Sequence, residues 1–261
     1  MAFHSPQQVA QKAVEAGVRK ASLSLLDKLL LGFLGGAFIS LGYLLDIRVI
    51  ASLPAEWGTL ASFIGAAVFP LGLILIIIAG GELLTGNMMA VAIAVMAKKV
   101  KVSSLINNWF WITIANFLGA IFVAYFFGHV AGLTAADPFL HKVIAVAEGK
   151  LEPNFIQALV SAIGCNWLVC LAVWMSYTAE DIGGKILAIW WPIMGFVAIG
   201  FQHVVANMFI IPAAIFEGHF SWMDYLSNFV PVFIGNAIGG AIFVGLIYYV
   251  TYLRQDKKAV K

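Results

Sequence analysis

The chain has 261 residues, of which 62% are hydrophobic and only 11% are charged, and its formal net charge is +2 at pH 7. Soluble domains are about 45–50% apolar and about 25% charged, so this composition excludes an ordinary soluble domain. A net charge this small also gives no basic footprint for a nucleic acid. The composition predicts an integral membrane protein.

The chain begins with a polar segment that contains several basic residues. Residues 5–20 alternate small apolar and polar side chains, which predicts a short amphipathic helix on the cytoplasmic surface. The apolar stretch that follows is long and has no small-residue cleavage site after it, so we expect a first span and not a signal peptide. We assign residues 1–25 to this segment, 26–253 to a single six-span core and 254–261 to a C-terminal tail.

Charged residues delimit the apolar segments of the core. A spanning helix needs roughly 20 apolar residues, so the run 83–97 is too short to cross alone and joins the run before Glu82. The fifth segment is also too long for one straight helix. Glycine and proline offer break points at Gly80, Gly81 and Gly86 in the second segment and at Pro192, Gly195 and Gly200 in the fifth. The predicted spans are 26–46, 57–97, 103–131, 154–177, 186–216 and 228–253.

The distribution of basic residues predicts the orientation. With six spans, all but three of the 15 Lys and Arg residues lie on the side of the two termini. The exceptions are Arg48, Lys142 and Lys150. Because cytoplasmic loops are enriched in Lys and Arg, we expect both termini in the cytoplasm.

The two halves of the chain resemble each other at a shift of 120 residues. The second and the fifth span contain corresponding break points, and each half contains three spans. An odd number of crossings per repeat places the halves in opposite orientations. The sequence therefore predicts two inverted three-helix repeats, with the second and fifth helices interrupted beside a central pathway. The matching pairs are Gly80 and Gly200, Asn87-Met88 and Asn207-Met208, Asn116 and Asn236, and Gly119 and Gly239, while Glu82 corresponds to Gln202.

Polar residues inside the spans are candidates for this pathway. His203, at the second break, is the strongest candidate, although a structural histidine is the alternative. Glu82 is expected to cap helix amides or to pair with a neighbour, because a bare carboxylate would repel anions. Thr85 either packs its methyl group or lines a pore. Asn116 and Asn236 are expected to form interhelical hydrogen bonds.

Other candidates have simpler alternatives. Lys150 lies just outside the fourth span, where a solvated surface lysine is common. The two cysteines, Cys165 and Cys170, lie in an apolar run and are expected to be buried and reduced. Five scattered histidines give no metal or haem pattern, so we expect no cofactor and no membrane enzyme. An aquaporin-type channel shares the six-span plan, but Asn87 and Asn207 are not in Asn-Pro-Ala boxes.

Three motifs together resemble the formate/nitrite transporter family. They are Gly-Glu-Leu-Leu-Thr-Gly-Asn at 81–87, Cys-Asn-Trp-Leu-Val-Cys-Leu-Ala-Val-Trp at 165–174 and Gln-His-Val-Val-Ala-Asn-Met at 202–208. The resemblance extends over about residues 5–254. It implies an aquaporin-like protomer in a homopentamer of the cytoplasmic membrane, with one pore in each subunit. Such pores conduct small monovalent anions or their acids, and the permeant expected here is formate, with nitrite or hydrosulfide as alternatives.

The resemblance also implies residue roles. His203 would be the central pore histidine, Asn166 its polar neighbour, Thr85 part of the loop that interrupts the second span, and Lys150 the lysine of the outer vestibule. Gln202 departs from the glutamate that is frequent in the family. His203 could donate a proton to the permeant or hydrogen-bond it directly, and the sequence leaves both open. An outer constriction of Leu83 and Leu84 and an inner constriction of Phe69, Leu73 and Phe196 complete the implied pore.

Overall fold

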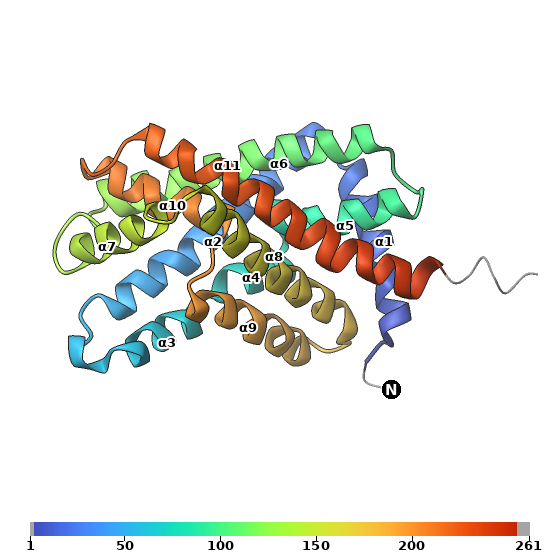
Figure 1. The fold of residues 1–261 in the computed structure, drawn as a ribbon, viewed down its shortest axis with the longest axis horizontal. Coiled ribbons are helices and arrows are strands. Elements are labelled where there is room, and N and C mark those ends of the chain that lie inside the picture. The colour runs from blue at the N-terminus through green and yellow to red at the C-terminus, as the bar shows by residue number, and fades with distance from the viewer. Residues whose placement is uncertain (1–2, 255–261) are drawn as a thin grey trace, which may run out of the picture.

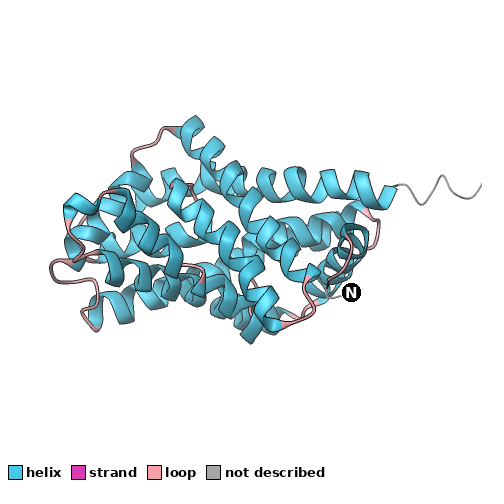
Figure 2. Cartoon of the chain, turned by 90° about the horizontal axis from the view of Figure 1, so that it is seen from below, coloured by secondary structure: helices cyan, strands magenta, loops and turns pink. Residues whose placement is uncertain are grey.

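The computed structural model describes residues 3–254, which fold almost entirely into helices (Figures 1 and 2). Within this range the only β pairing is an isolated bridge between Phe3 and Ala179. A helix satisfies its backbone polar groups within the segment, which an apolar chain in lipid requires. The predicted all-α membrane fold is confirmed.

Six helical segments are long and apolar enough to cross a membrane, as predicted. Some ends differ from expectation. The first span continues to Ile50, four residues beyond Asp46, and the sixth begins at Trp222, because Ser221 caps the helix and Asp224 lies in its first turn. The segments are α2 (Leu25–Ile50); α3 (Thr59–Val68), α4 (Leu71–Leu75) and η2 (Ile76–Gly80); α6 (Val102–Phe122) and η3 (Val123–Val130); α8 (Phe155–Thr178); α9 (Ile182–Ile199); and α11 (Trp222–Ile238), η4 (Gly239–Leu246) and η5 (Tyr249–Leu253).

Two spans are interrupted, and a short apolar helix follows each break. The chain leaves the second span at Gly80, with φ of 103°, and resumes as α5 (Leu84–Met96). It leaves α9 at Gly200, with φ of 87°, and resumes as α10 (Val204–Phe216). Positive φ is costly for residues with a side chain, which explains a glycine at both exits.

Three of the predicted break points are wrong. Gly86 lies inside α5, and Pro192 and Gly195 lie inside α9, which continues without a break to Ile199. Neither glycine has a positive φ. Proline is tolerated within a membrane helix where neighbouring groups satisfy the freed carbonyl, so composition alone overestimates its effect.

A further short helix lies beside each of the two short helices that follow the breaks, α5 and α10, which we call the half-helices. α1 (Pro6–Ser22), the predicted amphipathic helix, packs against α5, with Val9 and Ala13 fully buried. α7 (Phe139–Leu151) was not predicted and packs against α10. Figure 1 shows α1 and α5 toward one end of the molecule, and α7 and α10 toward the other. A short 3-10 turn, η1 (Ala55–Trp57), connects α2 to α3.

The half-helices form the centre of the protein. Every residue from Val204 to Ala214 is buried, and so is every residue from Leu84 to Ala94. The long helices surround them in pairs, chiefly α2 with α6 and α8 with α11. Both cysteines, Cys165 and Cys170, are buried and free. Since α5 and α10 both begin near the middle of the molecule, their N-terminal residues can meet there.

Candidate pore and its two vestibules

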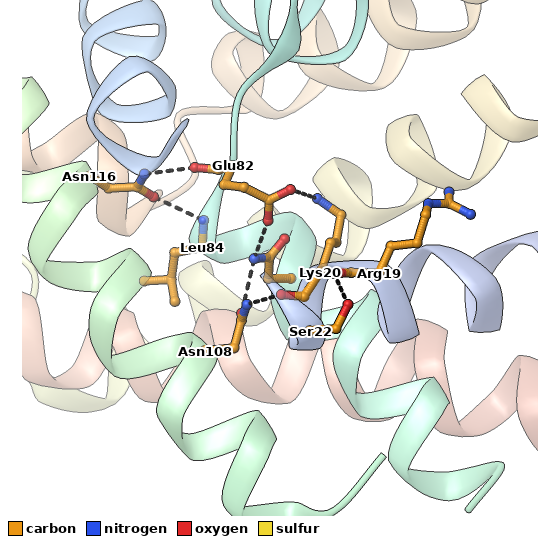
Figure 3. Close-up of polar contacts among 8 residues, drawn as sticks. Arg19, Lys20, Ser22, Glu82, Leu84, Asn108 and Asn116 are labelled. Carbon is orange, nitrogen blue, oxygen red and sulfur yellow. Dashed lines mark hydrogen bonds and ion pairs between the residues drawn. The ribbon is translucent and has the colours of Figure 1, made fainter. Parts of the chain in front are cut away.

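One asparagine holds the first break together. Asn116 accepts a hydrogen bond at Oδ1 from the amide of Leu84, 2.9 Å away, at the start of α5. Its Nδ2 donates to the carbonyl oxygens of Gly32, at 2.7 Å, and Glu82, at 2.8 Å. Figure 3 shows Asn116 between Glu82 and Leu84. The side chain thus satisfies backbone groups that the interruption of the helix leaves free.

A second asparagine repeats this arrangement at the other break. Asn236 Oδ1 accepts from the amide of Val204 at 2.8 Å, and its Nδ2 donates to the carbonyls of Ala162, at 2.8 Å, and Gln202, at 3.1 Å. These partners correspond to those of Asn116 at a shift of 120 residues, except that Gly32 and Ala162 are 130 apart. The two halves therefore satisfy the backbone groups at their breaks with the same asparagine hydrogen bonds. Their opposite orientation in a membrane stays a prediction.

The Glu82 carboxylate ties α1 to the first break, as Figure 3 shows. Its Oε1 accepts from Lys20 Nζ at 2.7 Å, and its Oε2 accepts from Asn87 Nδ2 at 2.7 Å. Asn87 Nδ2 also donates to Asn108 Oδ1, and Asn108 Nδ2 donates to the carbonyl of Lys20. Glu82 is therefore paired with a lysine, one of the two roles expected of it.

At the second break, the equivalent glutamine gives a neutral version of this network. Gln202 Oε1 accepts from Asn207 Nδ2 at 2.7 Å, and Gln202 Nε2 donates to the carbonyl of Lys150 at 3.0 Å. Asn207 donates to Asn228 Oδ1, and Asn228 donates to the same carbonyl of Lys150. Lys150 thus corresponds to Lys20, but its ammonium has no carboxylate at residue 202 to pair with.

The Lys150 ammonium instead caps the broken end of α9. Its Nζ donates to the carbonyls of Gly200, at 3.3 Å, and Phe201, at 3.0 Å. A cation is favourable at a helix C-terminus, where the carbonyls carry partial negative charge. Burial lowers the pKa of Lys150. Lys150 is therefore not a freely solvated surface lysine.

The first residues of the half-helices meet at His203 and Thr85. His203 is 2% exposed and caps α10, because its Nδ1 accepts from the amide of Ala206 at 3.0 Å. Its Nε2 lies 3.0 Å from Thr85 Oγ1. Since Nδ1 accepts a hydrogen bond, a neutral imidazole carries its proton on Nε2 and donates to Thr85. Asn166 donates to the carbonyl of Thr85 at 3.2 Å, so it supports Thr85 and does not bond to His203.

A cavity on one side of His203, which we call the Lys150 vestibule, has a volume of about 200 Å³. It combines cationic, acidic and aromatic side chains from α2, α7 and α9 with Phe69, which directly follows α3. Lys142 and Asp46, which the sequence did not single out, belong to it. The lining includes Tyr43, Asp46, Phe69, Lys142, Lys150, Phe196 and His203.

Beyond this vestibule lies a small space, the apolar gap, of about 10 Å³. A space of this size holds at most about one water molecule. Phe69 and Phe196 line both cavities and pack edge to face, with ring centroids 5.7 Å apart, while Phe196 stacks on His203. The pathway is therefore closed by apolar side chains. The gap is lined by Ile39, Phe69, Leu73, Leu83, Val169, Ile193, Phe196 and His203.

The constriction residues are arranged differently from the prediction. Phe69 and Phe196 were assigned to the inner side, but they line the Lys150 vestibule, which is the outer one in the predicted orientation. Leu83 was assigned to the outer side, but it lines the gap together with Leu73. Leu84 is fully buried and lines neither cavity. The sequence order within a broken span does not show how the chain turns at the break.

A larger cavity, the Lys20 vestibule, lies at the other end and has a volume of about 580 Å³. Its lining includes Arg19 and Lys20 from α1, Glu82 from the first break and Lys185 from α9. Both mouths are thus rich in lysine, and the middle is apolar. Among residues 3–254, no group of three His, Cys, Asp or Glu side chains is placed to hold a metal ion.

The geometry agrees with the comparisons to known proteins. The family model described as "Formate/nitrite transporter" matches residues 7–250. The chain is 63% identical over 257 residues to "Uncharacterized transporter YrhG" of Bacillus subtilis, covering 98% of this chain and 97% of that protein. It is 60% identical over 255 residues to "Formate channel BtFdhC" of Bacillus thuringiensis, covering 98% of each.

A solved structure has the same fold. The "Pentameric formate channel with formate bound" superposes with a TM-score of 0.73 at 27% identity, covering 88% of this chain and 98% of that one. Family and relatives are channels or transporters and not enzymes. This chain, a multi-pass membrane protein, belongs to the formate/nitrite transporter family.

Proposed function

We propose that this protein conducts formate across the cytoplasmic membrane as a homopentamer, with one pore in each protomer and both termini in the cytoplasm. The 60% identity to a formate channel and the fold shared with a pentameric formate channel support the substrate and the assembly. The bias of Lys and Arg toward one side supports the orientation.

The observation that carries the proposal is an apolar gap between two lysine-rich vestibules. Lysines at each mouth attract a small anion from water. The gap, bounded by Phe69 and Phe196, offers no charge to replace the hydration shell of that anion. Moving an ionised carboxylate into such surroundings is far more costly than moving the neutral acid. Formate therefore crosses the gap together with a proton, as formic acid.

His203 contributes a hydrogen bond to this passage and not a proton. Its Nδ1 already accepts from the amide of Ala206, so adding a proton there would break the helix cap. Losing the Nε2 proton would leave an imidazolate, which is far too basic to form near neutral pH. Of the two roles that the sequence left open, these hydrogen bonds support direct interaction of the permeant with the Nε2–H of His203, which lines the gap and which Thr85 orients.

Uptake into proteoliposomes containing the purified protein tests the proposal. Radiolabelled formate should enter faster than into empty liposomes, saturate with concentration and acidify the lumen. Osmotic swelling in glycerol should equal that of empty liposomes. Fast swelling in glycerol with no formate uptake would instead support an aquaporin-type channel, and nitrite entering much faster than formate would change the substrate.

A further inference from the structure

We propose that Asp46, on α2, is a proton-exchange site of the Lys150 vestibule, where its carboxyl group passes a proton from vestibule water to the entering anion. The inference rests on the proposed formate conduction and adds the group that supplies the proton. Asp46 lines the same cavity as Lys142, Lys150 and His203. Phe69 and Phe196 line this cavity too, so an anion that enters it must become neutral before it passes these rings.

The carboxyl group of Asp46 is buried without a hydrogen-bond partner. The residue is 5% exposed, and Oδ1 has no partner within residues 3–254. The fold leaves space for this group, because a Cβ atom on Gly65 of α3 would overlap Asp46 Oδ1. Buried polar atoms are nearly always paired, and an ionisable group at membrane depth is costly. An unpaired carboxyl group that lines the entry chamber therefore suggests a functional role.

Other titratable side chains also face this chamber. Lys142 and Lys150, both from α7, line the chamber, and the Lys150 ammonium bonds to two carbonyls at the end of α9. His203, at the start of α10, uses both ring nitrogens in hydrogen bonds. Tyr43, on α2 with Asp46, packs against Phe69 with ring centroids 5.3 Å apart. A phenol and an ammonium are much weaker acids than a carboxyl group, so of these groups the Asp46 carboxyl is the one suited to protonate formate in mildly acidic water.

The proton transfer can be written with every atom accounted for. The lysines hold a formate ion beside the protonated Asp46, whose O–H bond breaks as the O–H bond of formic acid forms. Formic acid passes Phe69 and Phe196, and Asp46 is left as a carboxylate. A hydronium ion from the vestibule then protonates Asp46 again. One proton therefore enters with each formate, and no other reactant is needed.

A purely electrostatic role for Asp46 predicts that its substitution changes formate uptake in the direction opposite to a proton-transfer role. If its negative charge only weakened the attraction of anions by the lysines, removing that charge would increase uptake, and added salt would reduce the increase. If the carboxyl group carries the proton, the same substitution lowers uptake. The sign of the change therefore separates the two roles.

The experiment measures formate uptake and lumen acidification together, with wild-type protein and Asp46→Asn, at mildly acidic external pH. Proton transfer by a positioned side chain typically increases a rate by about 10²–10⁴-fold. Because vestibule water can still protonate formate in Asp46→Asn, we expect the rates of uptake and of acidification to fall only about tenfold. Imidazolium buffer, small enough for the vestibule, should restore uptake in Asp46→Asn but not increase it in the wild type. Glu56→Gln removes an exposed acid outside the vestibule and should behave as wild type.

Each outcome decides the inference. Unchanged or increased uptake in Asp46→Asn, or a loss that imidazolium does not restore, overturns it. If Asp46→Asn does not assemble, Asp46→Ser is measured instead, and failure of both to assemble would show that the carboxyl is structural. Absence of formate uptake by the wild type would contradict the proposed function, whereas normal wild-type uptake with an unaltered Asp46→Asn would contradict only this inference.

Discussion

Replacing Lys150 with methionine removes one of the two lysine charges of the Lys150 vestibule but keeps most of the side-chain volume. A cavity of about 200 Å³ is about 7 Å across if taken as a sphere, so a bound anion lies within about 7 Å of the ammonium. Two unit charges at about 7 Å interact by about 2.4 kcal/mol at an effective dielectric constant of about 20, and by about 0.6 kcal/mol at about 80. Lys150→Met should therefore raise the half-saturating formate concentration about three- to fiftyfold.

Initial uptake rates over a range of formate concentrations, at low and high ionic strength, measure this shift. The variant should be slow at low concentration and approach the wild-type rate at saturation, and added salt should narrow the difference. Lys150→Arg keeps the charge and Lys99→Ala removes an exposed lysine outside both vestibules, so both should behave nearly as wild type. An unchanged half-saturating concentration at every ionic strength would refute the role of Lys150.

The partly buried position of Lys150 predicts how its effect on the half-saturating formate concentration changes with pH. Because burial lowers the pKa of Lys150, its charge is present below that pKa and is lost as the pH rises through it, earlier than for a surface lysine. The difference between wild type and Lys150→Met should therefore shrink at alkaline pH. Lys150→Arg, which keeps its charge, should retain the low half-saturating concentration there.

The remaining predictions concern the two breaks. Asn116→Ala and Asn236→Ala each remove three hydrogen bonds, and each bond is worth about 0.6 kcal/mol in membranes. Thermal unfolding in detergent should therefore show a similar loss of stability for both variants. A loss of stability in only one of them would contradict the equivalence of the breaks. Glu82→Gln keeps the bond from Asn87 but loses the ion pair with Lys20, so trypsin should cleave α1 faster, whereas equal cleavage would show that the pair does not hold α1. His203→Asn retains an N-cap acceptor and should conduct more slowly with an unchanged pH profile; a flattened profile would show that the imidazole itself titrates.

Much of the fold was predictable because apolar segments and breaking glycines are read directly from the chain. α7 was missed because Lys142, Glu148 and Lys150 interrupt its apolar residues and made the segment resemble a loop. Its buried face consists only of Val143 and Ala147, spaced four residues apart, which is the signal that could have identified it.

The site residues were predictable only where a polar side chain stands beside a recognisable helix break in the sequence. His203 was recognised as a lone polar residue beside a break. Asp46 was interpreted as the end of the first span, because a charge in an apolar sequence marks a boundary more often than a buried group. The pairing of Glu82 with Lys20 joins residues 62 positions apart, and no local pattern specifies it. Long-range geometry of this kind requires the folded chain.

The central claim is that formate crosses the apolar gap together with a proton. The most direct measurement records formate uptake and lumen pH in the same proteoliposomes while a membrane potential is imposed with potassium and valinomycin. One proton should enter with each formate, and the uptake rate should not change with the potential, because a neutral acid passes Phe69 and Phe196. Uptake that follows the potential without acidifying the lumen would show that the bare anion crosses, and would contradict the account.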